Sequence, residues 1–526
     1  MSYQSFSFIL FSAIVLLLYY LVGRKRQLWI LALANLTFYA IAGVQYIPFI
    51  LVTTIATFFA GKKMSSIYQE ADEKINACTD RAEKKQLRTD AKAKAKKALM
   101  VGMFVTLALL VVCKYTTFIL ENLNLILVGL NIPQITIFKM VLPLGISFYS
   151  FMALSYVLDI YWKRYQAEQN FLVYATYLSY FPHVVQGPID RFNEFKEQIK
   201  DGVALSYKNV TYGAQLAIWG FFKKLVIADR LGLFVDTVFD TWQECDGIII
   251  IASVIAYSIQ IYADFSGCID IVTGVSEMFG IRLRKNFNHP YFSKTMPEFW
   301  RRWHISLQEW FKDYVYYPVS TSDFVRNGKK YFKNKENLRG MELFSSCFPV
   351  LVVWMITGIW HGADWKYVAW GMFHAVLLIG SQIFDPFFKK MTERLKINTE
   401  KFSWHLWQMS RSFALCCIGR VFFRADGIVV AFQMLYKMFT SVSLGALFHA
   451  QSNYGMSVAD VIASIVGVIV LWIVDMLQEK MGIRETLAKQ HIVVRWIIIY
   501  AGLFAVILMG IYGPGYDASS FIYEQF

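Results

Sequence analysis

The chain has 526 residues, of which 56% are hydrophobic, 17% are aromatic and only 17% are charged. A soluble domain carries roughly 25% charged residues, so this composition argues against a soluble globular protein and indicates one that folds in lipid. The formal net charge of +14 would suggest nucleic-acid binding in a soluble protein, but no DNA- or RNA-binding motif accompanies it. We assign the excess to basic loops on the cytoplasmic side of a membrane, and expect no nucleic-acid partner.

Apolar runs long enough to cross a bilayer recur along the chain. A membrane-spanning helix needs about 20 such residues, and sustained strand-like alternation, which a β-barrel would require, is missing from the sequence. The fold class is therefore predicted to be all-α, a polytopic integral membrane protein with roughly 10–14 membrane-embedded helices. The runs are residues 6–23, 28–45, 46–61, 99–115, 142–162, 207–226, 246–263, 342–360, 364–384, 456–477 and 493–512, with shorter or interrupted ones near 171–187, 229–240 and 404–423.

The first run, residues 6–23, has its basic residues after it, in GRKRQ, rather than before it. This arrangement predicts a retained first helix and not a cleaved signal peptide. Basic clusters remain on the cytoplasmic side, so the amino terminus is predicted to lie outside. The expected location is the cytoplasmic (inner) membrane, which the chain crosses several times.

Residues 62–98 interrupt the apolar runs with eleven Lys or Arg against six acidic residues. This composition predicts a basic, helical, surface-lying cytoplasmic hairpin that can sit on anionic lipid. A solvated linker helix and a docking site for a partner are the alternatives. No separable soluble domain is evident, so residues 1–526 are predicted to form a single membrane domain.

A second polar region, residues 282–340, is predicted to be an interfacial helix followed by a polar loop. The stretch PEFWRRWHISLQEWFKDYVYY is expected to form one amphipathic helix from Pro297, with aromatic residues on one arc and charged residues on the other. His304 falls at the edge of the aromatic arc, where it either faces an enclosed cavity or makes a hydrogen bond at the membrane interface.

Residues 357–374, TGIWHGADWKYVAWGMFH, carry two histidines in an apolar, aromatic setting. Ionisable groups at membrane depth are costly and tend to mark function. His361 lies between Gly358 and Gly362, which allow close approach of a substrate or of backbone, and an imidazole there can take a proton from a hydroxyl near neutral pH. His374 is expected to be a packed, hydrogen-bonded histidine.

Other catalytic signatures are missing from the sequence. It has no GxSxG, HExxH, GxxxxGK[ST] or GxGxxG motif, and its seven cysteines form no CxxC pattern. His361 and Asp364 alone are a weak metal motif, since no third ligand has supporting spacing. We therefore expect reduced thiols and no metal site.

Several motifs, in one order along the chain, resemble the membrane-bound O-acyltransferases. They are LPLGISFYSFMALSYVLDIY, FPHVVQGPIDRF, YADFSGCIDIVTG, NFNHPY, FWRRWHISLQEWFKDYVYYP, GIWHGADW and VFFRA, which together cover residues 142–425. The resemblance is to the bacterial branch that includes alginate O-acetyltransferase and the D-alanyl transferase of teichoic acids. This chain departs from the family pattern in two places. Relatives of the alginate type usually have a Leu-Gly-Gly turn after the element that DYVYYP matches, and in the FPxxxxGP element they usually have a small residue where this chain has Gln186.

The resemblance implies an acyltransferase core over residues 142–425, with a funnel and tunnel through the membrane. It identifies His361 with the family's invariant histidine and His304 with its second histidine. We hypothesise that His361 is the general base on the acceptor hydroxyl, while His304 positions the thioester or stabilises developing charge. The residues predicted to line the passage are Trp303, Asn286, Asp313, Trp360 and Trp365.

The resemblance also implies the substrates and partners. An acyl thioester, either acetyl-CoA or a loaded acyl carrier protein, is the expected co-substrate, with no bound cofactor. The acceptor is a hydroxyl of a cell-envelope polysaccharide, reached directly or through an extracytoplasmic SGNH-type acetyltransferase. D-alanyl transfer to teichoic acid from a carrier protein, a polysaccharide or lipid transporter, and a scaffold of an export complex are the alternatives.

Overall fold

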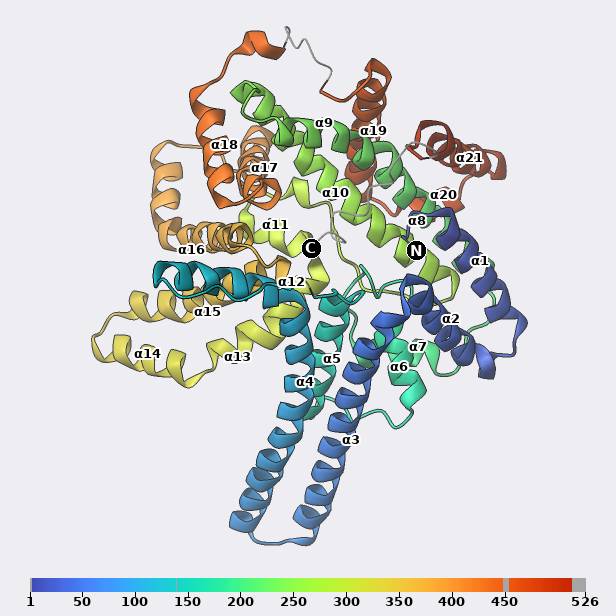
Figure 1. Ribbon diagram of the computed structural model, residues 1–526, viewed down its shortest axis with the longest axis vertical. Helices are drawn as coiled ribbons and strands as arrows, with labels where there is room; N and C mark the ends of the chain where they lie inside the picture. The colour runs from blue at the N-terminus through green and yellow to red at the C-terminus, as the bar shows by residue number, and fades with distance from the viewer. Residues whose placement is uncertain (1, 139, 448–453, 513–526) are drawn as a thin grey trace. The chain divides into compact units, whose positions relative to one another are not determined.

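The computed structural model describes residues 2–138, 140–447 and 454–512, and within these ranges it is helical and without β-strands (Figure 1). The predicted all-α class is confirmed. Its helices are α1 (Phe6–Leu21), α2 (Gln27–Ala42), α3 (Ile47–Ala77), α4 (Arg81–Gly129), α5 (Ile146–Tyr161), α6 (Phe171–Ser179), α7 (Phe192–Ile199), α8 (Tyr207–Phe221), α9 (Asp229–Asp240), α10 (Gly247–Met278), α11 (Met296–Arg302), α12 (Ile305–Phe311), α13 (Tyr317–Ser320), α14 (Asp323–Asn334), α15 (Leu338–His361), α16 (Trp365–Arg394), α17 (Phe402–Arg424), α18 (Ile428–Thr440), α19 (Val458–Gln478), α20 (Ile483–Ala488) and α21 (Ile492–Met509).

Short turns complete the described residues. Two π-helical segments, η3 (Phe222–Ala228) and η5 (Lys312–Tyr316), follow α8 and α12 without a break in the chain direction. The 3-10 turns are η1 (Arg24–Arg26), η2 (Val44–Tyr46), η4 (Pro290–Phe292) and η6 (Leu444–Leu447).

Seven of the described helices are long and apolar enough to cross a membrane. Three shorter apolar helices, α1, α5 and α18, add to them. The protein is therefore a multi-pass membrane protein, as predicted, whereas the number of embedded helices stays a prediction. The seven helical segments are Val44–Ala77, Arg81–Gly129, Gly247–Met278, Leu338–His361, Trp365–Arg394, Val458–Gln478 and Ile492–Met509.

The described chain divides into two compact units. The first comprises Met1–Ala214 and Val272–Arg284, and the second comprises Gln215–Ile271 and Lys285–Phe526. Helices α8 and α10 each contribute residues to both units, so the division does not follow an exposed linker. The single membrane domain stays a prediction.

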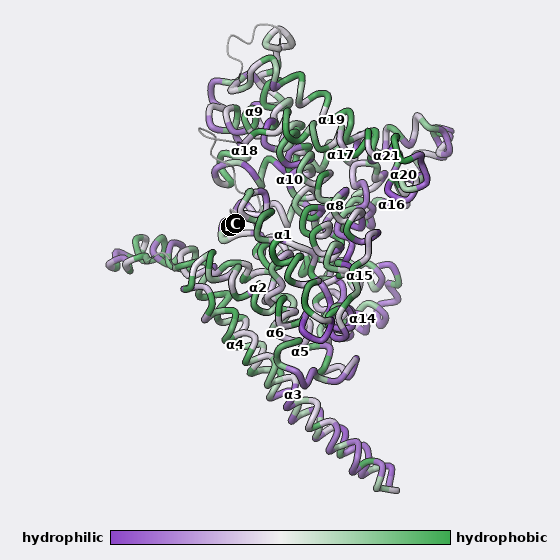
Figure 2. Tube along the Cα trace, turned by 90° about the vertical axis from the view of Figure 1, so that its right-hand side faces the viewer, coloured by the Kyte–Doolittle hydropathy of each residue, from purple (hydrophilic) through white to green (hydrophobic). Residues whose placement is uncertain are grey.

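In the first unit, the polar segment 62–98 forms a helical hairpin made by the continuation of two apolar helices. Helices α3 and α4 have 31 and 49 residues and lie antiparallel, side by side (Figure 1). The Asp80 carboxylate ends the turn by accepting hydrogen bonds from the backbone N–H groups of Ala82 and Glu83, which fixes the start of α4. Figure 2 shows the residues changing from hydrophobic to hydrophilic toward this turn.

The second unit contains both predicted catalytic histidines. Its core is rich in aromatic side chains contributed by α10, α11, α16 and α17. Two buried lysines of this unit have acidic partners: Lys224 lies 2.7 Å from Asp264 and 2.8 Å from Asp229, and Lys223 lies 2.6 Å from Asp270. Pairing of this kind is what allows charges to be buried at all.

Candidate functional site

The predicted continuous helix from Pro297 to Tyr317 is wrong, because the chain leaves the helical path at His304. Helix α11 ends at Arg302, and α12 starts at Ile305. Between them His304 takes a left-handed conformation, with φ 48° and ψ 52°. Such a conformation costs a non-glycine residue roughly 1–3 kcal/mol and persists only where surrounding contacts impose it.

Those contacts come from a short extended segment that precedes α11. The Asn288 backbone N–H donates to the Arg302 carbonyl at 2.9 Å, and the Ile305 N–H donates to the Asn286 carbonyl at 2.9 Å. Phe287 and Trp303 form an isolated antiparallel bridge between these two hydrogen bonds. A backbone pairing across some eighteen residues therefore holds His304 out of the helix.

The Asn286 side chain fixes the imidazole of His304. Its Oδ1 lies 3.1 Å from His304 Nδ1 and accepts hydrogen bonds from the backbone N–H and hydroxyl of Ser306 at 3.1 and 2.9 Å. A backbone N–H can only donate, so this amide atom is an acceptor and Nδ1 must carry the ring proton. Burial lowers the pKa of His304 to about 3, so the ring is neutral and Nε2 bears its lone pair.

His361 is the last residue of α15, where that helix crosses α16 at van der Waals contact. A Cβ at Gly358 would lie 2.5 Å from the Tyr367 carbonyl oxygen, and a Cβ at Gly371 would lie 2.4 Å from the Trp354 carbonyl oxygen. Only glycine permits such a crossing. The expected close approach at Gly358 is therefore to the backbone of α16, and it sets the position of His361.

One tryptophan ring packs near both histidines. The Trp360 ring centroid is 6.3 Å from that of His304 and 4.8 Å from that of His361. The structure thus brings the two predicted catalytic residues together from α15 and from the break between α11 and α12. Both are buried, with exposed fractions of 1% and 4%.

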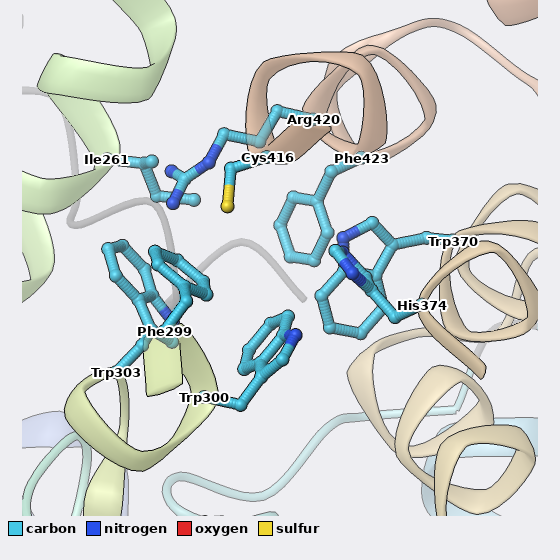
Figure 3. A pocket seen from close by; sticks show the side chains of 9 residues that line it. All are labelled: Ile261, Phe299, Trp300, Trp303, Trp370, His374, Cys416, Arg420 and Phe423. Carbon is cyan, nitrogen blue, oxygen red and sulfur yellow. The ribbon is translucent and has the colours of Figure 1, made fainter. Parts of the chain in front are cut away.

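A small cavity adjoins this pair, enclosed by α10, α11, α16 and α17 (Figure 3). Trp370 and Phe423 line it, and their ring centroids are also 4.8 and 5.3 Å from that of His361. Trp303, next to His304 in the chain, forms another wall. The other lining residues are Ile261, Phe299, Trp300, His374, Cys416 and Arg420.

The remaining predicted residues differ in their surroundings. Trp303 is buried and lines the cavity, whereas Asn286 acts on the His304 ring. Asp313 is partly buried in η5. Trp365, at the start of α16, is 53% exposed, so its role in lining the passage stays a prediction. His374 is packed as predicted, but its Nδ1 has no hydrogen-bond partner among the described residues.

Arg420 was not identified from the sequence as a site residue. It lies in α17, which also contributes Cys416 and Phe423 to the cavity wall. An arginine inside an otherwise apolar run is a signal for function, and the segment VFFRA follows it directly. In the described part of the chain, no group of three or more His, Cys, Asp or Glu residues is arranged to hold a metal ion.

Comparison with known proteins gives one consistent family. The model of the membrane-bound O-acyltransferase family matches residues 167–331. A probable alginate O-acetylase of Pseudomonas putida is 31% identical over 82% of this chain and 78% of its own length. A peptidoglycan O-acetyltransferase of Helicobacter pylori is 29% identical over 78% of this chain and 73% of its own length. A teichoic acid D-alanyltransferase of Bacillus subtilis is 30% identical, but over 47% of this chain and 60% of its own length.

Proposed function

Because the chain belongs to the membrane-bound O-acyltransferase family, we propose that it moves an acetyl group from a thioester donor to a hydroxyl of a cell-envelope polysaccharide, either directly or through a partner transferase. The enzyme is an O-acyltransferase. The acetyl group is favoured because the relatives that cover most of the chain are named for O-acetylation of alginate and of peptidoglycan. D-alanyl transfer is the second candidate, supported by the shorter match to the teichoic acid enzyme.

The observation that carries the proposal is that the Trp360 ring packs near the rings of both His304 and His361. In the proposed reaction His361 takes the proton of the acceptor hydroxyl while the hydroxyl oxygen attacks the thioester carbonyl carbon. The carbon–sulfur bond then breaks, and the leaving thiolate receives that proton. General-base assistance of this kind contributes about 10²–10⁴-fold to a rate.

The geometry favours a positioning role for His304 over charge stabilisation. Its only ring proton is committed to Asn286, so Nε2 can accept a hydrogen bond but cannot donate one to a carbonyl oxygen that gains negative charge. In our proposal Nε2 accepts a hydrogen bond from the hydroxyl or from an amide N–H of the donor. The aromatic rings around both histidines would exclude water and limit hydrolysis of the thioester.

We place the donor on the side of the α3/α4 hairpin, with that side cytoplasmic and the amino terminus outside. Six cations of α4 fall within roughly 120° of the helix circumference and extend for about 22 Å, and the acidic residues of the same segment lie on another arc. None of the six forms an ion pair with the described residues. This basic stripe consists of Arg81, Lys84, Lys85, Arg88, Lys92 and Lys96.

A stripe of this form suits an acidic carrier protein that delivers the acyl thioester. The stripe lies on the polar first part of α4, before the apolar part of the same helix. The potential of a lipid surface falls off within about 8 Å at physiological salt. Lipid headgroups are therefore poorly placed to neutralise its far end. An extracytoplasmic SGNH-type transferase would receive the acyl group on the opposite side of the membrane.

The test is transfer of a labelled acetyl group by the purified protein in nanodiscs, with acetyl-CoA and acetyl-loaded carrier protein as alternative donors and alginate or peptidoglycan fragments as acceptors. We expect ester formation by the wild type and its loss in His361→Ala. The matched control is His405→Ala, which removes a histidine of α17 that does not line the cavity. Equal ester yields from wild type and His361→Ala would remove His361 from the reaction, and D-alanyl transfer alone would select the second candidate.

A further inference from the structure

Arg420 is a buried cation with no acidic partner among the described residues. It is 6% exposed, and its Nη1 donates one long hydrogen bond, of 3.5 Å, to the Ser258 carbonyl oxygen. The other buried cations of the second unit, Lys223 and Lys224, each have a carboxylate within 2.8 Å. Arg424, one helical turn further along α17, pairs with Asp236 at 2.6 Å.

The surroundings offset only part of the cost of this charge. The guanidinium carbon lies 4.4 Å from the centroid of the Trp303 ring and 5.8 Å from that of Tyr291. A cation–π contact contributes about 0.5–2 kcal/mol, whereas burying an unpaired ion costs several kcal/mol. A guanidinium has five N–H donors. The Ser258 carbonyl and the Tyr291 hydroxyl are neutral acceptors for it, and neither carries a compensating negative charge. The site therefore favours an anion.

The cavity beside Arg420 has two further unsatisfied polar atoms. Trp300 Nε1 and His374 Nδ1 are buried and have no hydrogen-bond partner among the described residues, although both side chains are more than nine-tenths buried. In Figure 3 these two side chains and the Arg420 guanidinium surround the same space. An indole N–H can only donate, so it adds a second donor for an anionic oxygen.

The size and walls of the cavity limit the ligand. The centre of a water molecule has only about 20 Å³ in which to move there. The space therefore suits a group of a few non-hydrogen atoms and excludes a long acyl chain. Five aromatic rings make most of the wall, which suits a methyl group; they belong to Phe299, Trp300, Trp303, Trp370 and Phe423.

We propose that this cavity is a binding site for a small monocarboxylate, the size of acetate, with its carboxylate on the Arg420 guanidinium and its methyl group against the aromatic wall. A planar guanidinium matches a carboxylate with two parallel hydrogen bonds. Trp370 and Phe423 line both this cavity and the surroundings of His361, so the bound anion lies next to the reaction centre. If the proposed acetyl transfer holds, free acetate, the product of donor hydrolysis, slows the enzyme by occupying this site.

The experiment measures binding directly and needs no acyl donor, so its outcome is independent of the proposed function. Labelled acetate is titrated into purified full-length protein in detergent, in a gluconate buffer free of chloride. Acetamide, a neutral molecule of the same shape, and hexanoate, a longer carboxylate, serve as competitors. We expect one acetate per chain, no competition by acetamide and weaker competition by hexanoate than by unlabelled acetate.

Three variants locate the site. Arg420→Met should weaken acetate binding about tenfold or more, the loss expected for one charge-assisted contact. Arg424→Gln, which removes a paired arginine from the same helix, should bind as the wild type does. Cys416→Leu, which fills the cavity while leaving Arg420 in place, should also weaken binding and keeps the test available if Arg420→Met does not fold.

Four results would overturn the proposal. They are no saturable binding of acetate, equal competition by acetamide, unchanged affinity in both Arg420→Met and Cys416→Leu, and displacement of acetate by chloride at equal concentration. The last would indicate a halide site. A melting temperature that rises with acetate in the wild type and in Arg424→Gln, but not in Arg420→Met, would support the same site, since a ligand that binds only the folded state stabilises it.

Discussion

Replacing Asn286 by alanine tests whether the orientation of His304 depends on one amide oxygen. That Oδ1 accepts hydrogen bonds from His304 Nδ1, from the Ser306 backbone N–H and from the Ser306 hydroxyl. The hydroxyl can rotate to another acceptor and the imidazole can carry its proton on Nε2 instead, but the Ser306 backbone N–H is a fixed, buried donor. Leaving it unsatisfied costs about 1–3 kcal/mol, so we expect a destabilisation of about that size.

The same substitution should impair catalysis more than stability alone explains. Without Oδ1 nothing fixes the proton on Nδ1, and the left-handed backbone at His304 loses one of its supports. A misplacement of about 1 Å can cost about 10²-fold in rate. The assay is acetyl transfer at a temperature well below the melting temperature of the variant, together with that melting temperature in the same detergent.

Two further variants make this result specific. Ser306→Ala removes only the hydroxyl hydrogen bond, so it should cost about 0.5–1.5 kcal/mol and leave transfer nearly unchanged. Asn286→Asp keeps an oxygen acceptor but adds a negative charge, which raises the pKa of His304. Its activity should therefore decline at a higher pH than that of the wild type as the solution is acidified. Wild-type turnover and an unshifted melting temperature in Asn286→Ala would refute the reasoning.

Further predictions concern the pH dependence, the helix crossing and the hairpin. The folded-state pKa of His304 is about 3, below its ordinary value of 6.5, so the unfolded chain binds this proton first. The stability of the wild type should therefore fall by about 1.4 kcal/mol more per pH unit than that of His304→Gln as the pH decreases below 6.5, measured as melting temperatures; parallel curves would contradict this. Gly358→Ala should destabilise the protein by about 1–3 kcal/mol and lower transfer, because its Cβ meets the Tyr367 carbonyl oxygen. Gly380→Ala, in open surroundings on α16, should do neither. Reversing three charges of the basic stripe, with Lys85→Glu, Arg88→Glu and Lys92→Glu, should lower transfer from a carrier-bound donor but not from acetyl-CoA. The same readout should be insensitive to Lys94→Glu with Lys97→Glu, which lie off the stripe; an equal effect of both sets would show that only net charge matters.

The sequence predicts the helical, membrane-embedded class well, because apolar runs of bilayer length leave no other way to satisfy the backbone. It also draws attention to His361, since ionisable rings are rare in such runs, whereas His304 was selected by the family resemblance, and the roles of both stay predictions. Periodicity fails at residues 297–317, where it predicts one helix. The break there depends on hydrogen bonds from Asn286 and Asn288, and a helical wheel contains no information on contacts between distant residues.

The exposure of Trp365 and the importance of Arg420 were also not predicted, because both depend on contacts between residues that are distant in the sequence. Trp365 was predicted to line the passage with Trp303 and Trp360, but unlike Trp303 and Trp360 it is 53% exposed, because it begins a new helix. Arg420 was missed because its apolar run was considered only as a possible span. Its significance lies in the absence of a carboxylate around it among the described residues, and such an absence becomes visible only in three dimensions.

The positions of the two histidines show where tertiary contacts, and not a helix, direct a titratable ring in this apolar fold. Within a helix, a side chain is directed by the helix axis and by its neighbours at i±3 and i±4. At His304 and His361 the helix ends, so tertiary contacts set the direction of the ring. Irregular backbone in a membrane protein is tolerated when protein covers it, and Trp303 and His304 are indeed 4% and 1% exposed. The same enclosure that satisfies this backbone keeps the His304 ring neutral and in one tautomer, which is why a change at Asn286 should be felt first in the chemistry and only then in the fold.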